Sequence, residues 1–166
     1  MNRLPKDGEG ADLRGKSLSG VDLTGANLRQ SNLSHALLDR ASLMRTDLSD
    51  AILRGTILFE ADLTKANLVN ADLTDAVLGR AQFRFANLSG ASLVRAALRE
   101  ADLSDADLTG ADLTAAELTY SNLTRANLSG AVLTSANLKG ALLMDVVYNL
   151  ETLWPDGYEP VDRTGR

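Results

Sequence analysis

Leucine recurs at every fifth position over most of this chain. From Leu13 to Leu143, all 27 positions in this register are leucine except Phe83. A second position, two residues before each leucine, is alanine in 21 of the 27 cases. This period fits neither an α-helix, which repeats about every 3.6 residues, nor a flat strand, which repeats about every two. The sequence therefore predicts a repeating unit made of one short extended segment and one turn.

Stacked copies of such a unit can bury leucine and alanine along a shared axis while backbone groups pair between coils. Charged outward residues test how many units form a coil, because direct stacking favours opposite charges and disfavours like charges. A spacing of 20 residues gives six opposite pairs and one like pair, whereas a spacing of 15 gives three opposite and seven like pairs. We therefore predict a square coil of 20 residues. Its like-charged pair is Arg45 and Lys65, and one favourable column runs through Arg40, Glu60, Arg80 and Glu100.

The units also resemble those of a known family. They read Ala-Asp/Asn-Leu-x-x, as in the three consecutive units of residues 61–75. This pattern is similar to that of the pentapeptide-repeat proteins, and the match covers roughly residues 11–145. The resemblance implies an all-β fold, a right-handed quadrilateral parallel β-helix with about seven coils of four pentapeptides. We accordingly expect a flexible N-terminal tail at residues 1–10, the β-helix at 11–145, and a C-terminal cap and tail at 146–166.

The only tryptophan and two of the three tyrosines follow the repeats. A bare final coil would expose its leucines and unpaired backbone groups, so we expect an apolar segment to fold over that end. We predict a turn at Pro155-Asp156-Gly157 within this segment. The same segment resembles tails that follow pentapeptide repeats in cyanobacterial proteins. The predicted cap consists of Val146, Val147, Tyr148, Leu150, Leu153, Trp154 and Tyr158.

Three residues depart from the repeat. Lys16 takes an inward alanine position near the start, which predicts an incomplete first coil whose lysine reaches solvent. The alternative is that this end is a docking surface. Phe83 in a leucine position predicts a local bulge of the wall, and Phe85 should point outward.

The composition argues against an enzyme. The chain has no cysteine, and its single histidine, His35, falls at an outward position. The carboxylates recur in phase with the repeat, where short polar side chains bond turn amides, and none forms a cluster with the spacing of metal ligands. We therefore expect no catalytic residue, no cofactor and no metal.

The charge and hydropathy patterns limit the possible partners. A net charge of −5, from 22 acidic and 17 basic residues, argues against nucleic-acid binding through a basic patch. The N-terminal residues carry no apolar signal, and the chain has no long apolar stretch. We expect a cytoplasmic protein without membrane contact.

The most direct functional hypothesis is a scaffold that binds a partner protein of unknown identity. A spacing of 20 residues stacks an apolar outward column with Phe59 beside it. Such a stripe on a solenoid can be a contact surface, or it can simply strengthen the wall through stacked β-branched side chains. Both interpretations remain open. The column consists of Leu37, Ile57, Val77 and Ala97.

Two alternatives come from other classes of function. Some pentapeptide-repeat proteins mimic a DNA duplex and bind DNA gyrase, which requires negative charge along the rod. The acidic run in this chain has no basic residue within it, but a square coil spreads it around one turn. Self-association, end to end through the N-terminal coil or side to side through the apolar column, would give a homodimer. The acidic run consists of Glu100, Asp102, Asp105, Asp107, Asp112 and Glu117.

Overall fold

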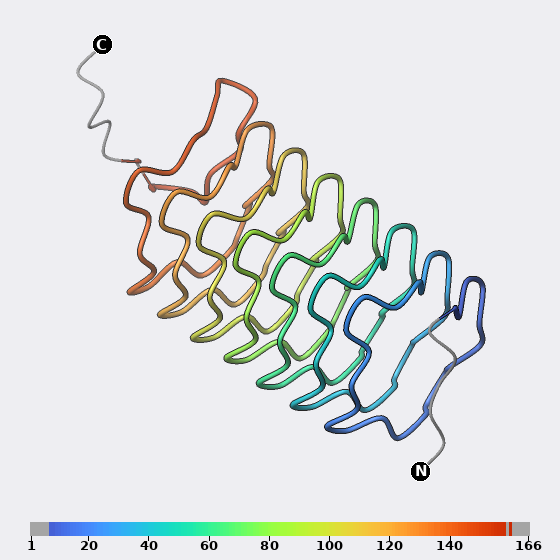
Figure 1. Ribbon diagram of the computed structural model, residues 1–166. Coiled ribbons are helices and arrows are strands. Elements are labelled where there is room, and N and C mark those ends of the chain that lie inside the picture. The colour runs from blue at the N-terminus through green and yellow to red at the C-terminus, as the bar shows by residue number, and fades with distance from the viewer. Residues whose placement is uncertain (1–6, 159, 161–166) are drawn as a thin grey trace.

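The computed structural model describes residues 7–158 and 160. The chain winds as a right-handed quadrilateral β-helix (Figure 1). Its secondary structure consists of single-residue parallel bridges separated by turns, and none of the described residues lies in a helix or a longer strand. All bridges but the last, from Val132 to Leu153, join residues 20 positions apart, and the column that begins with Asp7 and Asn27 reaches Val147 in seven such steps. The predicted coil of four pentapeptides and the predicted fold class are confirmed.

Four bridge columns define the four faces of the coil, which we number in chain order. The turn that follows each face is called a corner and takes the number of that face. Within a unit, the alanine and leucine positions point inward, the bridge residue between them points outward, and the last two residues form the corner. Face 1 runs from Asp7 to Val147, face 2 from Asp12 to Leu153, face 3 from Ser17 to Asn137, and face 4 from Asp22 to Leu142.

Each corner from Gly10 to Gly140 is a four-residue turn closed by a hydrogen bond. At a typical corner, the amide of Ala76 donates to the carbonyl of Leu73 at 3.0 Å, and Asp75 between them has a φ of 59°. A positive φ at the third residue is characteristic of a type II turn. The left-handed conformation costs a non-glycine residue about 1–2 kcal/mol. The Asp75 amide also bonds the next coil, donating to the carbonyl of Val94 at 3.0 Å, and such stacking bonds offset this cost.

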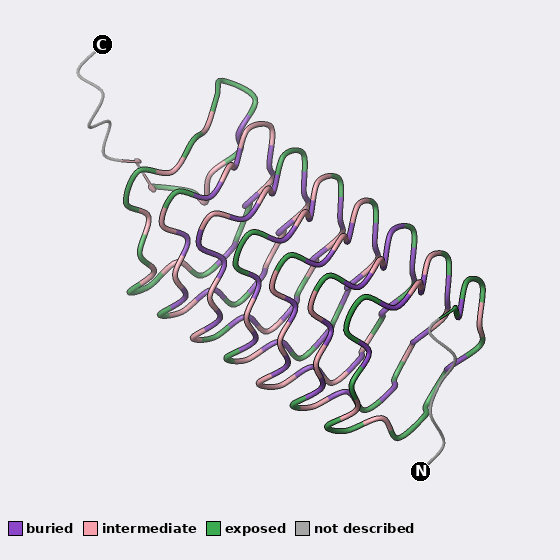
Figure 2. Cartoon of the chain, in the orientation of Figure 1, coloured by how far each residue is buried: buried purple, intermediate pink, exposed green. Residues whose placement is uncertain are grey.

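The inward positions form one continuous aliphatic core (Figure 2). From Leu23 to Leu133, every residue in the leucine register is at most 3% exposed. The inward serines and threonines are also buried, and each donates its hydroxyl to a leucine carbonyl, as Thr56 does to Leu33 at 2.9 Å. Among the described residues, no buried side-chain nitrogen or oxygen lacks a partner. The other inward residues whose hydroxyl donates to a leucine carbonyl are Ser31, Thr46 and Ser121.

The predicted bulge at Phe83 is wrong, because the wall keeps its regular hydrogen bonds there. The amide of Phe83 donates to the carbonyl of Asp102 at 2.7 Å, the same distance as from the amide of Leu73 to the carbonyl of Ser92 two faces earlier. Phe83 is fully buried. Its additional volume is therefore taken up inside the core rather than by the wall. Phe85 points outward, as expected, with half of its surface exposed.

The solenoid begins earlier than the predicted limit at residue 11. Asp7 bridges Asn27, and the amide of Gly8 donates to the carbonyl of Asn27 at 2.7 Å. Gly8 occupies a leucine position, and a Cβ there would lie 2.8 Å from Cδ2 of Leu28, whose side chain fills the space. The leucine register does not detect this unit because its inward residue is glycine. The rest of the predicted tail, residues 1–6, lies outside the described residues.

The β-helix also extends beyond the predicted limit at Asp145. Val147 bridges Asn127 in the regular register, and Leu153 then bridges Val132 with one additional residue in the coil. This insertion is accommodated near Asn149. At the corners from Gly10 to Arg125, a backbone carbonyl of the next coil accepts the corner amide, whereas Gly130 donates to the side-chain Oδ1 of Asn149 at 2.9 Å.

Candidate functional site

The apolar column predicted from the sequence lies along face 3. Consecutive bridges join Leu37 to Ile57, Ile57 to Val77, and Val77 to Ala97. Leu37 is 41% exposed and Val77 is 36% exposed, while Ile57 and Ala97 are half-buried. The four side chains therefore form one stripe parallel to the solenoid axis.

Phe59 extends this stripe onto corner 3. A Cβ on Gly79, one coil further on, would lie 3.2 Å from Cδ2 of the Phe59 ring, so the ring lies over this glycine. A larger residue at position 79 would displace the ring. Gly79 does not have a positive φ, so this glycine matters for its close approach and not for its backbone conformation.

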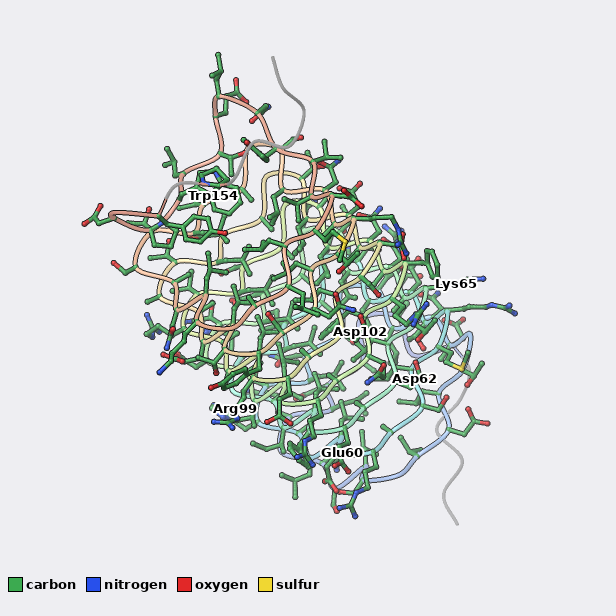
Figure 3. The ribbon with its side chains drawn as sticks, turned by 90° about the vertical axis from the view of Figure 1, so that its left-hand side faces the viewer. Glu60, Asp62, Lys65, Arg99, Asp102 and Trp154 are labelled. Atoms are coloured by element: carbon green, nitrogen blue, oxygen red, sulfur yellow. The ribbon has the colours of Figure 1, made fainter. Side chains whose placement is uncertain are left out.

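The same corner carries the predicted charge column, which borders the apolar stripe. The Nε atom of Arg40 donates to Oε2 of Glu60 at 3.1 Å, and Nε of Arg80 donates to Oε2 of Glu100 at 2.8 Å. Arg80 also lies 3.5 Å from Glu60, which makes the column continuous. Hydrogen bonds from Arg80 and Arg99 hold the pKa of Glu100 below its usual range. Figure 3 shows Glu60 and Arg99 near the same edge of the molecule.

Other opposite charges predicted to stack also meet. Arg95 pairs with Asp75, and Arg125 pairs with Asp105, each at 2.7 Å. The hydrogen bonds from these arginines lower the pKa of both aspartates. Arg125 and Asp145 do not come within ion-pair distance, although Asp145 contributes to raising the pKa of Arg125 behind the larger effect of Asp105.

The acidic run does not form a stripe along the axis. Its members lie at corner 3, face 4, corner 4, face 1, face 2 and face 3 in turn, so they encircle one coil. Arg80, Arg84 and Arg125 lie within 4 Å of Glu100, Asp102 and Asp105, respectively. Asp107 and Asp112 accept hydrogen bonds from the amides of Thr109 and Thr114 within their own units. These carboxylates serve the scaffold, and half of the run is neutralised.

The C-terminal segment contains both covering and outward residues. Val146, Tyr148 and Trp154 pack against the core, and Trp154 contacts Tyr148 edge-on with ring centroids 5.5 Å apart. Tyr158 stacks on Trp154 at 5.2 Å. Burial raises the pKa of Tyr158. The amide of Tyr158 donates to the carbonyl of Pro155 at 3.0 Å, which closes a turn over the predicted Pro-Asp-Gly sequence.

Three residues assigned to the cap point outward instead of covering the end. Leu150 is fully exposed, and Val147 and Leu153 are about half exposed. Their bridge and corner positions direct these side chains away from the axis. Two further exposed residues, which the sequence analysis missed, lie on the same coil. Together the five side chains lie along faces 4, 1 and 2 of the last coil, and we call them the C-terminal belt. The belt consists of Leu142, Met144, Val147, Leu150 and Leu153.

One coil earlier, the same outward positions are mostly polar or lack a side chain. This change of character within a single column was the available sequence signal for the belt. Detecting it requires comparing residues one coil apart, which is 20 positions for the first four and 21 positions for Leu153. The corresponding residues are Asn122, Thr124, Asn127, Gly130 and Val132.

Single polar residues offer little chemistry. His35 is exposed and lies over Gly55, where a Cβ would come 2.7 Å from Nδ1 of the imidazole. Lys16 is exposed near the N-terminal end of the solenoid. Within the described part of the chain, no three histidine, aspartate or glutamate side chains gather as a metal site would require. That part also contains no apolar helix long enough to cross a bilayer.

The chain belongs to the pentapeptide-repeat family. The family's sequence profile, Pentapeptide repeats, matches eight copies over residues 9–40, 41–80, 76–114 and 111–147. No curated protein sequence matches the chain significantly.

Solved structures of the same family resemble this chain over most of its length. HetL, involved in heterocyst differentiation regulation in the cyanobacterium Nostoc sp. strain PCC 7120, is 29% identical with a TM-score of 0.41, over 93% of this chain and 91% of HetL. A pentapeptide repeat protein of the Arabidopsis thaliana thylakoid lumen is 30% identical with a TM-score of 0.42, over 73% of this chain and 70% of that protein. A trypsin-treated variant of QnrB1, a plasmid-mediated fluoroquinolone resistance protein, is 20% identical with a TM-score of 0.51, over 89% and 88% of the two chains. At this identity, the likeness to QnrB1 concerns the fold alone.

Proposed function

We propose that this protein is a non-enzymatic scaffold that binds a partner protein through the apolar stripe of face 3. The observation that carries the proposal is the exposure of Leu37 and Val77 in one stacked column whose backbone is already paired. Because the backbone of this wall is satisfied within the solenoid, a partner meets mainly side chains. An exposed apolar stripe of this kind is typical of a contact surface.

The surroundings of the stripe favour contact over simple wall packing. Phe59 widens the stripe by lying over Gly79, which stacked β-branched residues alone would not require. The ion pairs around Glu60 and Arg80 border it on corner 3. An apolar centre with a polar rim is the usual composition of a protein interface.

Replacing both Ile57 and Val77 with serine is expected to abolish partner capture while the fold remains intact. Both side chains point outward, so their loss leaves the core unchanged. The measurement is affinity capture from a lysate of the source organism, followed by identification of the bound proteins. Ile52→Ser is the matched control, because Ile52 is 38% exposed in the bridge column of face 2. Capture of the same proteins by wild type, control and double variant would exclude face 3 as the contact surface.

Self-association is a second candidate function, and the C-terminal belt favours it. The belt contributes half of the large apolar residues that are exposed in the described chain. On the last coil, the amides of Leu143 and Asp145 form no backbone hydrogen bond with another described residue. Two copies related by a two-fold axis at this end, with their last coils overlapping, would cover both features. We therefore place self-association at the C-terminal end instead of the N-terminal coil or the apolar column.

The wild-type protein is then expected to be a dimer in solution, and Leu142→Gln with Leu150→Gln is expected to make it monomeric. The measurement is molar mass by light scattering over a concentration series. Leu37→Gln, which changes an exposed leucine on face 3, should remain dimeric. A wild-type protein that is monomeric up to about 1 mM, the weak limit of specific association, would rule out this function.

A further inference from the structure

Corner 4 carries like charges in direct succession, unlike the alternating column of corner 3. The corner residue changes from Arg45 to Lys65 to Phe85 over three coils, with Arg84 beside the phenylalanine. Backbone hydrogen bonds fix this order. The amide of Arg45 donates to the carbonyl of Thr64 at 3.1 Å, and the amide of Lys65 donates to the carbonyl of Arg84 at 2.9 Å. Stacked like charges repel, so this arrangement does not help the scaffold.

The two stacked cations are not neutralised within the described chain. Neither Arg45 nor Lys65 has a carboxylate of any described residue within ion-pair distance, whereas Arg84 lies 3.7 Å from Asp102. Figure 3 places Lys65 at the margin of the molecule, beyond Asp62 and Asp102. Two cations are therefore available to an external anion.

An exposed aromatic ring adjoins these cations. Phe85 is 50% exposed, and Nζ of Lys65 and Cζ of Arg84 each lie 5.9 Å from its ring centroid. The two charged groups therefore lie beside an apolar surface that is still exposed to water. A ligand with both negative charge and an apolar group would satisfy both features at once.

We propose that corner 4 binds a short acidic segment of a partner protein. Carboxylates of the segment pair with Arg45 and Lys65, and a neighbouring apolar or aromatic side chain covers Phe85. Successive coils are about 4.8 Å apart, so the three levels of the site span about 10 Å. Alternate side chains of an extended peptide are separated by about 7 Å, which suits two acidic residues with one residue between them.

The surroundings favour a short peptide over a nucleic acid. The next residue of the corner is Asp105, and Asp62 and Asp102 lie on the adjoining face 4. A long polyanion following the corner would meet these carboxylates, whereas a segment of a few residues would not. Face 4 separates this corner from the stripe of face 3 and its corner. The site is therefore independent of the surface assigned to the proposed function.

The test uses the full chain and a fluorescein-labelled ten-residue peptide in which glutamate alternates with alanine around one phenylalanine. Fluorescence anisotropy at low salt should show binding at least about tenfold tighter than for the same peptide with glutamine in place of glutamate. Binding should weaken as salt rises. The variant Arg45→Gln with Lys65→Gln should lose this preference, and Phe85→Ala should weaken binding of the glutamate peptide.

Lys139→Gln, which removes a cation from corner 3, is the matched control and should bind like wild type. The Ile57→Ser, Val77→Ser protein should also bind normally, which separates this site from face 3. A phosphoserine peptide of equal length reports whether phosphate serves as the anion, and a 20-nucleotide oligothymidylate tests nucleic acid. Equal affinity for the two peptides, an unaffected corner variant, or tighter binding of the oligonucleotide would each overturn the proposal. Thermal melting should show that the corner variant is no less stable than wild type, since it removes a repulsion.

Discussion

Replacing Leu73 with aspartate is expected to unfold the protein. Leu73 is fully buried in the middle of the solenoid, in a core lined by aliphatic side chains. A carboxylate there would have no partner and no water, and an unpaired buried charge costs several kcal/mol even after relaxation. This cost is comparable to the whole stability of an ordinary domain. The measurement is circular dichroism with thermal melting, which should show loss of the β spectrum at room temperature.

Ser92→Asp is the control for this experiment. Ser92 stacks directly above Asp72 on face 2 and points outward, where aspartate already recurs in the repeat. This variant places a carboxylate between Asp72 and Asp112, so it should melt at a lower temperature than wild type but keep the β spectrum at room temperature. A Leu73→Asp protein with an unchanged spectrum and melting temperature would show that the leucine register does not face the axis.

Truncating Phe83 is expected to have the second largest effect. Phe83 is the largest fully buried side chain, and the wall around it is regular. Removing its ring leaves a cavity that the stacked backbone resists closing, so Phe83→Ala should cost about 3–5 kcal/mol. Phe83→Leu restores the residue found elsewhere in the register and should cost less than about 1.5 kcal/mol. Urea unfolding of both variants measures the two free energies.

The comparison of the two variants is the informative result. If Phe83→Leu is as destabilising as Phe83→Ala, this coil requires the ring specifically, and the leucine positions are not interchangeable. If neither variant loses stability, the phenylalanine does not support the core.

The repeated part of the fold was predictable because one geometric rule governs every unit. An inward side chain at each fifth residue is visible in the sequence as leucine, and the coil length is visible in outward charges such as Arg95 and Asp75. The ends were not predictable, because the backbone continues its pattern where the consensus residues stop. Gly8 replaces leucine at one end, and Asn149 absorbs an inserted residue at the other.

One of the candidate surfaces was predictable from the sequence, and the other was not. The stripe of face 3 follows from the register, since residues 20 apart must stack. The C-terminal belt does not, because its exposure depends on which residues of the last segment turn inward. Tyr148 and Trp154 do so, while Leu150 does not, and all three are apolar in the sequence. Side-chain direction at an irregular end is decided by local backbone register, which composition does not reveal.

Cysteine accessibility would test the central claim most directly, because the natural chain has no cysteine to interfere. Single cysteines at Ala71, Asp72, Asp75 and Ala76 would sample two inward and two outward positions of adjacent units. Maleimide labelling under native conditions should be rapid at positions 72 and 75 and nearly absent at 71 and 76 until denaturant is added. Equal labelling at all four positions would contradict an axis lined by the leucine at every fifth position and by the alanine two residues before it.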